Sequence, residues 1–267
     1  MDIKELQSIY AAHPQTAAVA SLIDRGDARS IRLAGLQGSS AAMCTAALFL
    51  KRGGCLLCVM NDLEEAGYFY NDLVQLAGEA SVSFFPSAYH RHIKYGHTDA
   101  ANEVLRTEAL AVLQSDEPNV IIVSYPDAIA ERVLSKNVLK ENTLELHVNE
   151  KVDPLFVSDV LDNYHFEQTD YVYEPGQYAV RGSIMDIFSF SHERPYRVDF
   201  FGSEIESIRT FDVETQLSME KLREIRIVPE ISRYDDADSS LLELLPQDAL
   251  IVSHDAVWCR ERIASLW

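Results

Sequence analysis

An arginine, a carboxylate and an aromatic ring stand two residues apart in the segment 196–201, as Arg197, Asp199 and Phe201. The alternation of this segment is typical of a β-strand with one buried face, and residues two apart share a face. We therefore expect these three side chains on the exposed face. Arginine and aromatic residues are enriched at binding hot spots, so the pattern indicates a protein-binding surface. The alternative is that Arg197 only pairs with Asp199 and that Phe201 is tucked under the hairpin.

A glycine-rich loop lies between a strand predicted at 30–34 and a helix predicted at 41–52. Phosphate-binding loops occupy this position, and the candidate residues here are Gly35, Gly38, Ser39 and Ser40. Their motif needs a lysine directly after the last glycine, whereas the nearest lysine, Lys51, stands near the far end of the helix. We interpret the loop as a tight turn that does not bind ATP, with nucleotide binding as the alternative.

Other residue types that bind metals or catalyse reactions lack a supporting pattern. Cys55 and Cys58 lie in an apolar segment predicted as a strand, where residues three apart point to opposite faces and cannot share a metal ion. The sequence contains neither a G-x-S-x-G nor an H-E-x-x-H motif. It thus predicts no catalytic residue, no metal site and no cofactor, so we expect a chain that is not an enzyme.

The segment 86–99 has no periodicity and is predicted as a loop. Its three histidines are His90, His92 and His97. Because no fourth ligand is obvious nearby, we favour a solvated loop over a zinc site. The basic residues of this segment, Arg91 and Lys94, lie among tyrosines and are the best candidates in the chain for a weak DNA contact.

Composition limits the class of protein. The 267 residues are 47% apolar and 24% charged, which is typical of a globular chain of about two domains. The formal net charge of −19 repels nucleic acid, so strong autonomous binding to duplex DNA is not expected. The sequence lacks a membrane-spanning apolar run, a signal peptide and a disulfide framework. We expect a cytoplasmic monomer with no membrane partner.

The first half of the chain alternates predicted strands and helices, which indicates βαβ units and a parallel sheet. After 30–34, strands are predicted at 55–60, 82–85 and 119–124, and helices at 62–77, 102–115 and 126–134. A final βα unit, with a strand at 249–253 and a helix over 254–266, is expected to return to this sheet.

The middle of the chain is richer in strands. Strands are predicted at 144–148, 167–173, 178–188, 196–201 and 205–211, with one helix at 153–164 and a two-residue hairpin turn at Gly202-Ser203. We therefore predict an α/β fold in which 1–142 and 231–267 together form one domain. Residues 143–230 form an inserted, strand-rich α+β domain.

Four motifs between residues 173 and 218 resemble a signature that two families of bacterial repair proteins share, the excision-repair protein UvrB and the transcription-repair coupling factors (Mfd). They read G-Q-Y-A-V-R-G-S-I-M-D-I-F, P-Y-R-V-D-F-F, E-I-E-S-I-R and F-D-V-E-T-Q. The chain lacks the phosphate-loop lysine of UvrB, and only the short segment 86–99 stands where UvrB has a long DNA-inserting hairpin. It is therefore similar to the N-terminal part of the coupling factors, although Leu217 replaces an arginine that is usual there.

The resemblance implies a P-loop-NTPase-like (RecA-like) parallel-sheet domain with a degenerate nucleotide site. It also implies that the inserted domain binds UvrA, the damage-recognition ATPase of excision repair, through Arg181, Arg197 and Phe201. The position of Arg181 beside Gly182 leaves open the face of the strand on which it lies. The chain would then be a non-catalytic adaptor in transcription-coupled nucleotide excision repair.

The other parts of such a protein would lie outside this sequence. The resemblance implies an ATP- and Mg²⁺-dependent DNA translocase that displaces stalled RNA polymerase, with the polymerase and duplex DNA bound by the absent parts. It further implies a C-terminal domain that masks the UvrA-binding surface. The alternatives are a fragment of UvrB and a helicase-like module that binds nucleotide or DNA.

Overall fold

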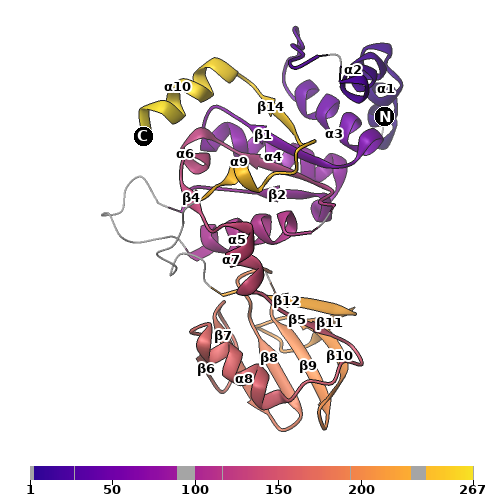
Figure 1. The fold of residues 1–267 in the computed structure, drawn as a ribbon. Helices are drawn as coiled ribbons and strands as arrows, with labels where there is room; N and C mark the ends of the chain where they lie inside the picture. The colour runs from indigo at the N-terminus through magenta and orange to yellow at the C-terminus, as the bar shows by residue number, and fades with distance from the viewer. Residues whose placement is uncertain are drawn as a thin grey trace. The chain divides into compact units, whose positions relative to one another are not determined.

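The computed structural model describes residues 3–26, 28–88, 100–115, 117–192, 194–229 and 239–266. The chain divides into two compact units (Figure 1). The first, here called the α/β unit, consists of Met1–Ser87, Ser115–Glu131 and Leu241–Trp267. The second, here called the strand-rich unit, consists of Ala88–Gln114 and Arg132–Ser240.

The α/β unit contains a sheet of four parallel strands in the order β14-β1-β3-β2. They are β1 (Cys55–Val59), β2 (Val82–Phe84), β3 (Val120–Ser124) and β14 (Leu250–Ser253). Every residue of β1 and β3 is buried, as expected of parallel strands that are covered on both faces. The predictions of these four strands are confirmed. β14 pairs with β1, so the chain does return to the first sheet.

The α/β unit also contains helices, and those before residue 26 and after residue 240 but before the last strand were not predicted. The helices are α1 (Ile3–Ala12), α2 (Pro14–Arg25), α3 (Ser40–Arg52), α4 (Leu63–Ala77), the 3₁₀ turn η1 (Glu79–Ser81), α6 (Pro126–Ile129), α9 (Leu241–Leu244) and α10 (Ala256–Leu266). α4 begins where predicted, because the Asp62 side chain accepts a 2.9 Å hydrogen bond from the backbone N–H of Glu65. Within the described ranges, no helix is long and apolar enough to cross a membrane.

Two predictions for this half of the chain are wrong. The segment 30–34 forms no strand, because its few apolar side chains do not reach a sheet, and Leu33 is 48% exposed. The helix predicted over 126–134 ends at Ile129, since Arg132 and Val133 pair as β4 (Arg132–Val133) with β13 (Ser239–Ser240). The strand that should precede a phosphate loop is therefore missing from the described part of the chain.

The strand-rich unit is built on a six-stranded sheet in the order β11-β10-β9-β8-β7-β6. Its strands are β6 (Glu167–Gln168), β7 (Gln177–Arg181), β8 (Ile184–Ile187), β9 (Tyr196–Phe201), β10 (Glu204–Phe211) and β11 (Ser218–Leu222). Neighbouring strands are antiparallel, except that β6 and β7 are parallel. The unit also contains a ladder between β5 (Leu144–His147) and β12 (Glu224–Ile227), and the helices α5 (Ala100–Leu113), α7 (Lys136–Glu141) and α8 (Pro154–Asn163).

Tight turns set the register of this sheet. The single strand predicted over 178–188 is wrong: Gly182 (φ 63°) and Ser183 form a two-residue turn, which splits the segment into β7 and β8. A side chain other than that of glycine would strain such a positive φ. The predicted turn at Gly202-Ser203 is confirmed by the pairing that flanks it. The strand predicted over 167–173 is limited to β6.

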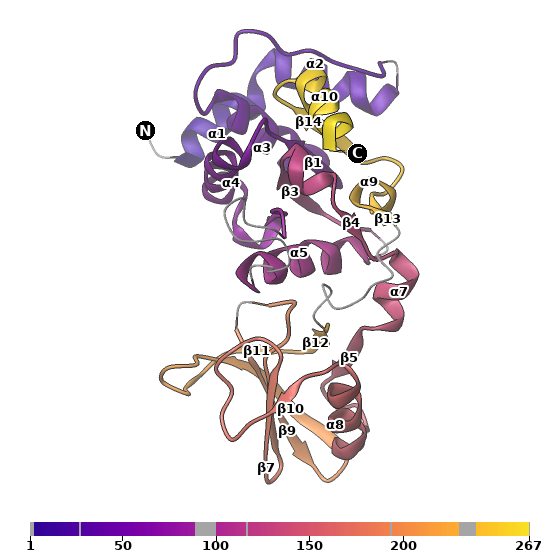
Figure 2. The same ribbon diagram turned by 90° about the vertical axis from the view of Figure 1, so that its left-hand side faces the viewer.

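One face of the six-stranded sheet, here called the inner face, packs against α8 (Figure 2). The helix buries Val157 and Leu161 in one cluster with Tyr196, Val198 and Phe200 of β9. As predicted, Asp153 caps the helix with a 2.9 Å hydrogen bond from the Leu155 N–H, and Pro154 follows it. The intervening residues of β9 therefore lie on the opposite face, here called the outer face.

Candidate functional site

The outer face carries the residues that the alternation of β9 placed together. Cross-strand partners in a sheet share a face, and Arg197 lies opposite Asp186 of β8, while Asp199 lies opposite Ile184. Arg181 in turn lies opposite Ile184, so it too is on the outer face, which the sequence left open. The arginines therefore come from two strands that both neighbour β8.

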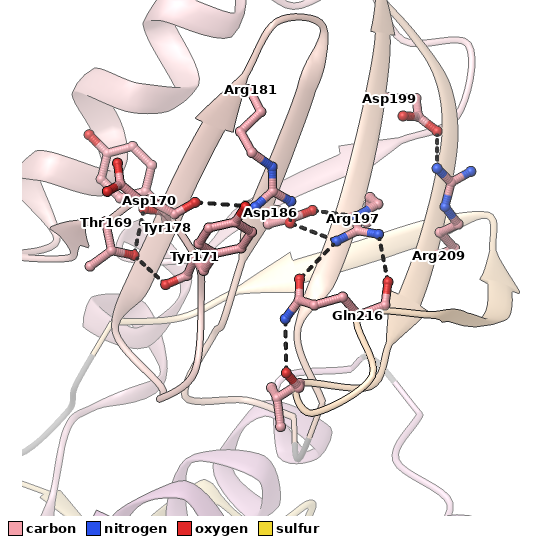
Figure 3. A network of polar contacts seen from close by, with 11 residues as sticks. Thr169, Asp170, Tyr171, Tyr178, Arg181, Asp186, Arg197, Asp199, Arg209 and Gln216 are labelled. Carbon is pink, nitrogen blue, oxygen red and sulfur yellow. Dashed lines mark hydrogen bonds and ion pairs between the residues drawn. The ribbon is translucent and has the colours of Figure 1, made fainter.

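Asp186 holds the two arginines together (Figure 3). Its carboxylate is fully buried and accepts hydrogen bonds of 2.7 Å from Nε and 2.9 Å from Nη2 of Arg197. Nη2 of Arg181 donates to the same carboxylate. Because a bidentate contact fixes a planar guanidinium, Arg197 has a defined orientation before any partner binds. We call Arg181, Asp186 and Arg197 the arginine cluster.

Arg197 is further enclosed by the loop that follows β10. Its Nη1 donates a 3.1 Å hydrogen bond to the backbone oxygen of Gln216, and its guanidinium stacks 4.3 Å from the ring centre of Phe211. The side chain is only 12% exposed. The hydrogen bond to Asp186 raises the pKa of Arg197 above its already high value. Arg197 is thus permanently charged, and most of its contacts are with residues of its own unit.

The F-D-V-E-T-Q motif forms this loop. The carboxylate of Asp212 accepts 2.8 Å hydrogen bonds from both the N–H and the hydroxyl of Thr215, and these bonds lower the pKa of Asp212. Gln216 follows with a positive φ of 58°, which directs its carbonyl to Arg197. Leu217, which directly follows this motif, is 67% exposed.

Arg181 is the more accessible member of the cluster. Its side chain is 33% exposed, and its guanidinium lies 5.0 Å from the ring centre of Tyr171. Nη1 donates a 3.2 Å hydrogen bond to the backbone oxygen of Asp170. A guanidinium has five N–H groups, so Arg181 retains donors for a further partner.

The alternative interpretation of the β9 residues is wrong on both points. Asp199 pairs at 2.8 Å with Arg209 of the neighbouring β10, and it also accepts a 2.7 Å hydrogen bond from Ser207. Ser207 lies directly opposite Asp199, and Arg209 lies diagonal to it, within reach of a long side chain. Phe201 is not tucked under the hairpin, because 80% of it is exposed. The outer face thus presents a free aromatic ring on the strand that carries Arg197.

Comparison with known protein families finds a match to this sheet. A family model described as the UvrB interaction domain matches residues 144–232, which include the whole six-stranded sheet. The match lies in the middle of the chain and leaves the α/β unit outside it. The arginine cluster and Phe201 lie within the residues that match this model, on the outer face of the sheet.

Curated relatives extend the similarity beyond the UvrB interaction domain. The chain is 29% identical over 199 residues to the transcription-repair-coupling factor of Bacillus subtilis (strain 168), covering 74% of this chain and 17% of the relative. It is 26% identical over 196 residues to that of Escherichia coli (strain K12), covering 73% and 17%. The predicted resemblance to this family is confirmed. The chain spans less than a fifth of the length of these relatives.

The glycine-rich loop has a different character from the outer face. Gly35 and Gly38 have positive φ values of 83° and 54°, and no atom lies within 4 Å of a Cβ placed on either. The Ser40 hydroxyl is already used, because it contacts both the N–H and the carbonyl of Gln37 at 2.7 Å. Ser39 occupies the N-cap position of α3, but its side chain makes no capping hydrogen bond. The loop is an exposed turn, and residues 35–40 include no lysine or arginine.

The remaining candidates contribute no described site. Cys55 and Cys58 are buried free thiols, and burial raises the pKa of Cys55 to about 11 and that of Cys58 further, so neither is a ready thiolate. No group of His, Cys, Asp or Glu within the described ranges could hold a metal ion. Arg91, Lys94 and the three neighbouring histidines lie outside the described residues.

Two residues of the strand-rich unit that position the arginines, Asp186 and Gln216, were not predicted from the sequence. Asp186 had a usable signal, because a carboxylate between Met185 and Ile187 in a buried strand requires a cationic partner. Gln216 had none, since the hydrogen bond from Arg197 depends on the path of the loop.

Proposed function

We propose that the UvrB interaction domain of this chain binds UvrA in transcription-coupled nucleotide excision repair, with Arg181, Arg197 and Phe201 as its contact residues. The observation that carries the proposal is an 80% exposed Phe201 on the face where a buried carboxylate fixes two arginines. The family match and the coupling-factor relatives support the choice of partner.

The three residues contribute differently in this proposal. Phe201 supplies apolar area that is exposed in the free chain and is buried on binding. Arg181 offers its remaining N–H groups to carboxylates of the partner. Arg197, which is 12% exposed, contributes mainly through its positive charge and by holding the Asp186 carboxylate in place. Binding loses little side-chain entropy at the arginines, because both are already ordered.

The α/β unit acts in this proposal as a helicase-like, RecA-like frame without motor chemistry. Its glycine loop lacks a lysine and has no preceding strand in the described residues, which supports a non-catalytic role for this chain. The chain is an adaptor that recruits UvrA to stalled RNA polymerase. The ATP-driven DNA translocase, the polymerase contacts and a domain that masks the outer face belong to a longer parent protein.

Calorimetric titration of the chain with purified UvrA tests this function. Phe201→Ala is expected to weaken binding at least about tenfold, as loss of a central aromatic contact does. Tyr68→Ala in α4 is the matched control, because Tyr68 is a 69% exposed aromatic residue of the other unit and is expected to leave binding unchanged. Wild-type affinity in a folded Phe201→Ala chain would show that the outer face is not the contact.

A further inference from the structure

β7 has an edge that is only half covered. Its partner β6 pairs with Gln177 and Tyr178 alone, and the ladder ends where the Thr169 N–H donates a 2.8 Å hydrogen bond to the Tyr178 carbonyl. The following residues of β7 have β8 on one side and no described strand on the other. The outer end of β7 is therefore an open strand edge.

The backbone of Val180 faces this open edge. In an antiparallel ladder, alternate residues direct their N–H and C=O groups to the neighbouring strand. The Phe188 N–H donates a 2.9 Å hydrogen bond to the Gln177 carbonyl. The backbone N–H and C=O groups of Gln177, Ala179 and Arg181 therefore point toward β8. The N–H and C=O of Val180 consequently point away from β8. Its side chain is 40% exposed, so the position is accessible.

Two hollows meet at Val180. On the inner-face side, a cavity of about 280 Å³ is lined by Pro154, Val180, Met185 and Phe200 and by the turn glycines Gly182 and Gly202. On the other side, a wider, more polar hollow is lined by Thr169, Tyr171 and Arg181, and again by Val180. The open edge thus has an apolar hollow on one side and a guanidinium on the other.

We infer that a short extended segment of the partner adds to the sheet as a strand at Val180. An added strand points alternate side chains to opposite faces, so an apolar side chain would enter the hollow beside Pro154 and the next residue would meet Arg181. That next residue is acidic, because the single carboxylate of Asp186 is shared by two guanidinium groups. The inference rests on the proposed function, which names UvrA as the partner, and adds how it binds.

Deuterium exchange of the wild-type chain, with and without purified UvrA, tests the inference without a substitution. An unpaired edge amide exchanges rapidly, so the Val180 amide is expected to slow at least about tenfold on binding. Calorimetry on the same samples reports whether a complex forms. A complex that leaves the exchange of Val180 unchanged overturns the strand addition but not the proposed function. Absence of a complex removes both.

Substitutions at Val180 provide an independent test. Val180→Pro removes the outward N–H but no hydrogen bond of the sheet, because proline is tolerated where a strand N–H faces solvent. It is expected to weaken binding about tenfold, as loss of one buried hydrogen bond does. Val180→Thr keeps the N–H and the shape and is expected to bind within about twofold of wild type.

The outcomes of the two tests also distinguish between occupants of the edge. Equal binding by a folded Val180→Pro chain contradicts the inference. Without UvrA, protection of the Val180 amide that increases with the concentration of the chain would assign the edge to a second copy. That outcome would also contradict the inference. If Val180→Pro fails to fold, which circular dichroism shows, the exchange measurement on the wild-type chain still decides.

Discussion

The glycine loop before α3 and the outer face of the six-stranded sheet both contain residue types that bind ligands, yet only the outer face has support beneath it. Gly35 to Ser39 are exposed, and the Ser40 hydroxyl bonds only to Gln37 in its own turn. Under the arginines of the outer face lies a carboxylate with no exposed surface. The difference is one of preorganisation: buried partners fix Arg181 and Arg197, whereas the loop fixes no charged group.

Removing the buried carboxylate is the strongest way to break this difference. Asp186→Asn leaves two guanidinium groups without their counter-charge, and breaking a buried ion pair of this kind costs about 3–5 kcal/mol. We expect about 3 kcal/mol in urea unfolding, because Arg181 is a third exposed and can be solvated. Asp199→Asn, whose ion pair with Arg209 is more exposed, is the control and is expected to cost about 1 kcal/mol. Equal costs would show that burial of Asp186 is not what supports the outer face.

The α/β unit also contains a bidentate ion pair. Arg262 of α10 donates 2.6 and 3.1 Å hydrogen bonds to both carboxylate oxygens of Asp127 in α6, and Cys259 is the buried residue of α10. Arg262→Ala is expected to cost up to about 1 kcal/mol, because the pair is partly exposed. Faster deuterium exchange of the Arg262→Ala chain, confined to the amides of α10, would show this local loss of stability. Arg260→Ala on the same helix, at an exposed position, serves as the control and should not change the exchange.

A smaller, pH-dependent effect is expected in the loop that supports Arg197. Hydrogen bonds from Thr215 lower the pKa of Asp212 in the folded chain below its ordinary value of 3.8. A depressed folded pKa stabilises the fold above the unfolded value and loses that contribution as pH falls through the folded pKa. Asp212→Ala should therefore lower the urea midpoint at pH 7 but approach the wild-type midpoint as pH falls below about 3.8. A gap that is constant with pH would contradict this assignment.

The glycine loop should give the smallest effect. Calorimetric titration of the chain with ATP and Mg²⁺ is expected to show no saturable heat, because a lysine that could reach the phosphates is absent from the loop. Saturable binding that is lost in Gly38→Val would place a nucleotide site here. It would then remove the distinction between this loop and the outer face.

The elements that could be predicted are those whose burial is periodic. The alternation of Tyr196–Phe201 placed β9 and its two faces correctly, because one face must be buried against α8. The parallel strands β1 and β3 were equally clear, since they are apolar throughout. The segment 30–34 also alternates apolar and polar residues, but it pairs with no described strand. Whether a segment finds a neighbouring strand depends on distant parts of the chain.

The candidate site was only partly visible in the sequence. Arg197 and Phe201 could be assigned to one face by period, and the motifs added Arg181. The side of Arg181 depends on the turn at Gly182, which the local pattern does not distinguish from the interior of one longer strand. The alternative that paired Arg197 with Asp199 along its own strand failed, because the register of β8 against β9 supplies Asp186 as the partner. Cross-strand register is long-range information that local periodicity does not contain.

The shared carboxylate has a consequence for any mutational study of the outer face. With either arginine removed, the other keeps Asp186 to itself, and with both removed the carboxylate is buried without a counter-ion. The double substitution should therefore cost more than the sum of the two single ones. Arg181 and Arg197 form one epistatic unit, so the effect of changing either depends on whether the other is still present.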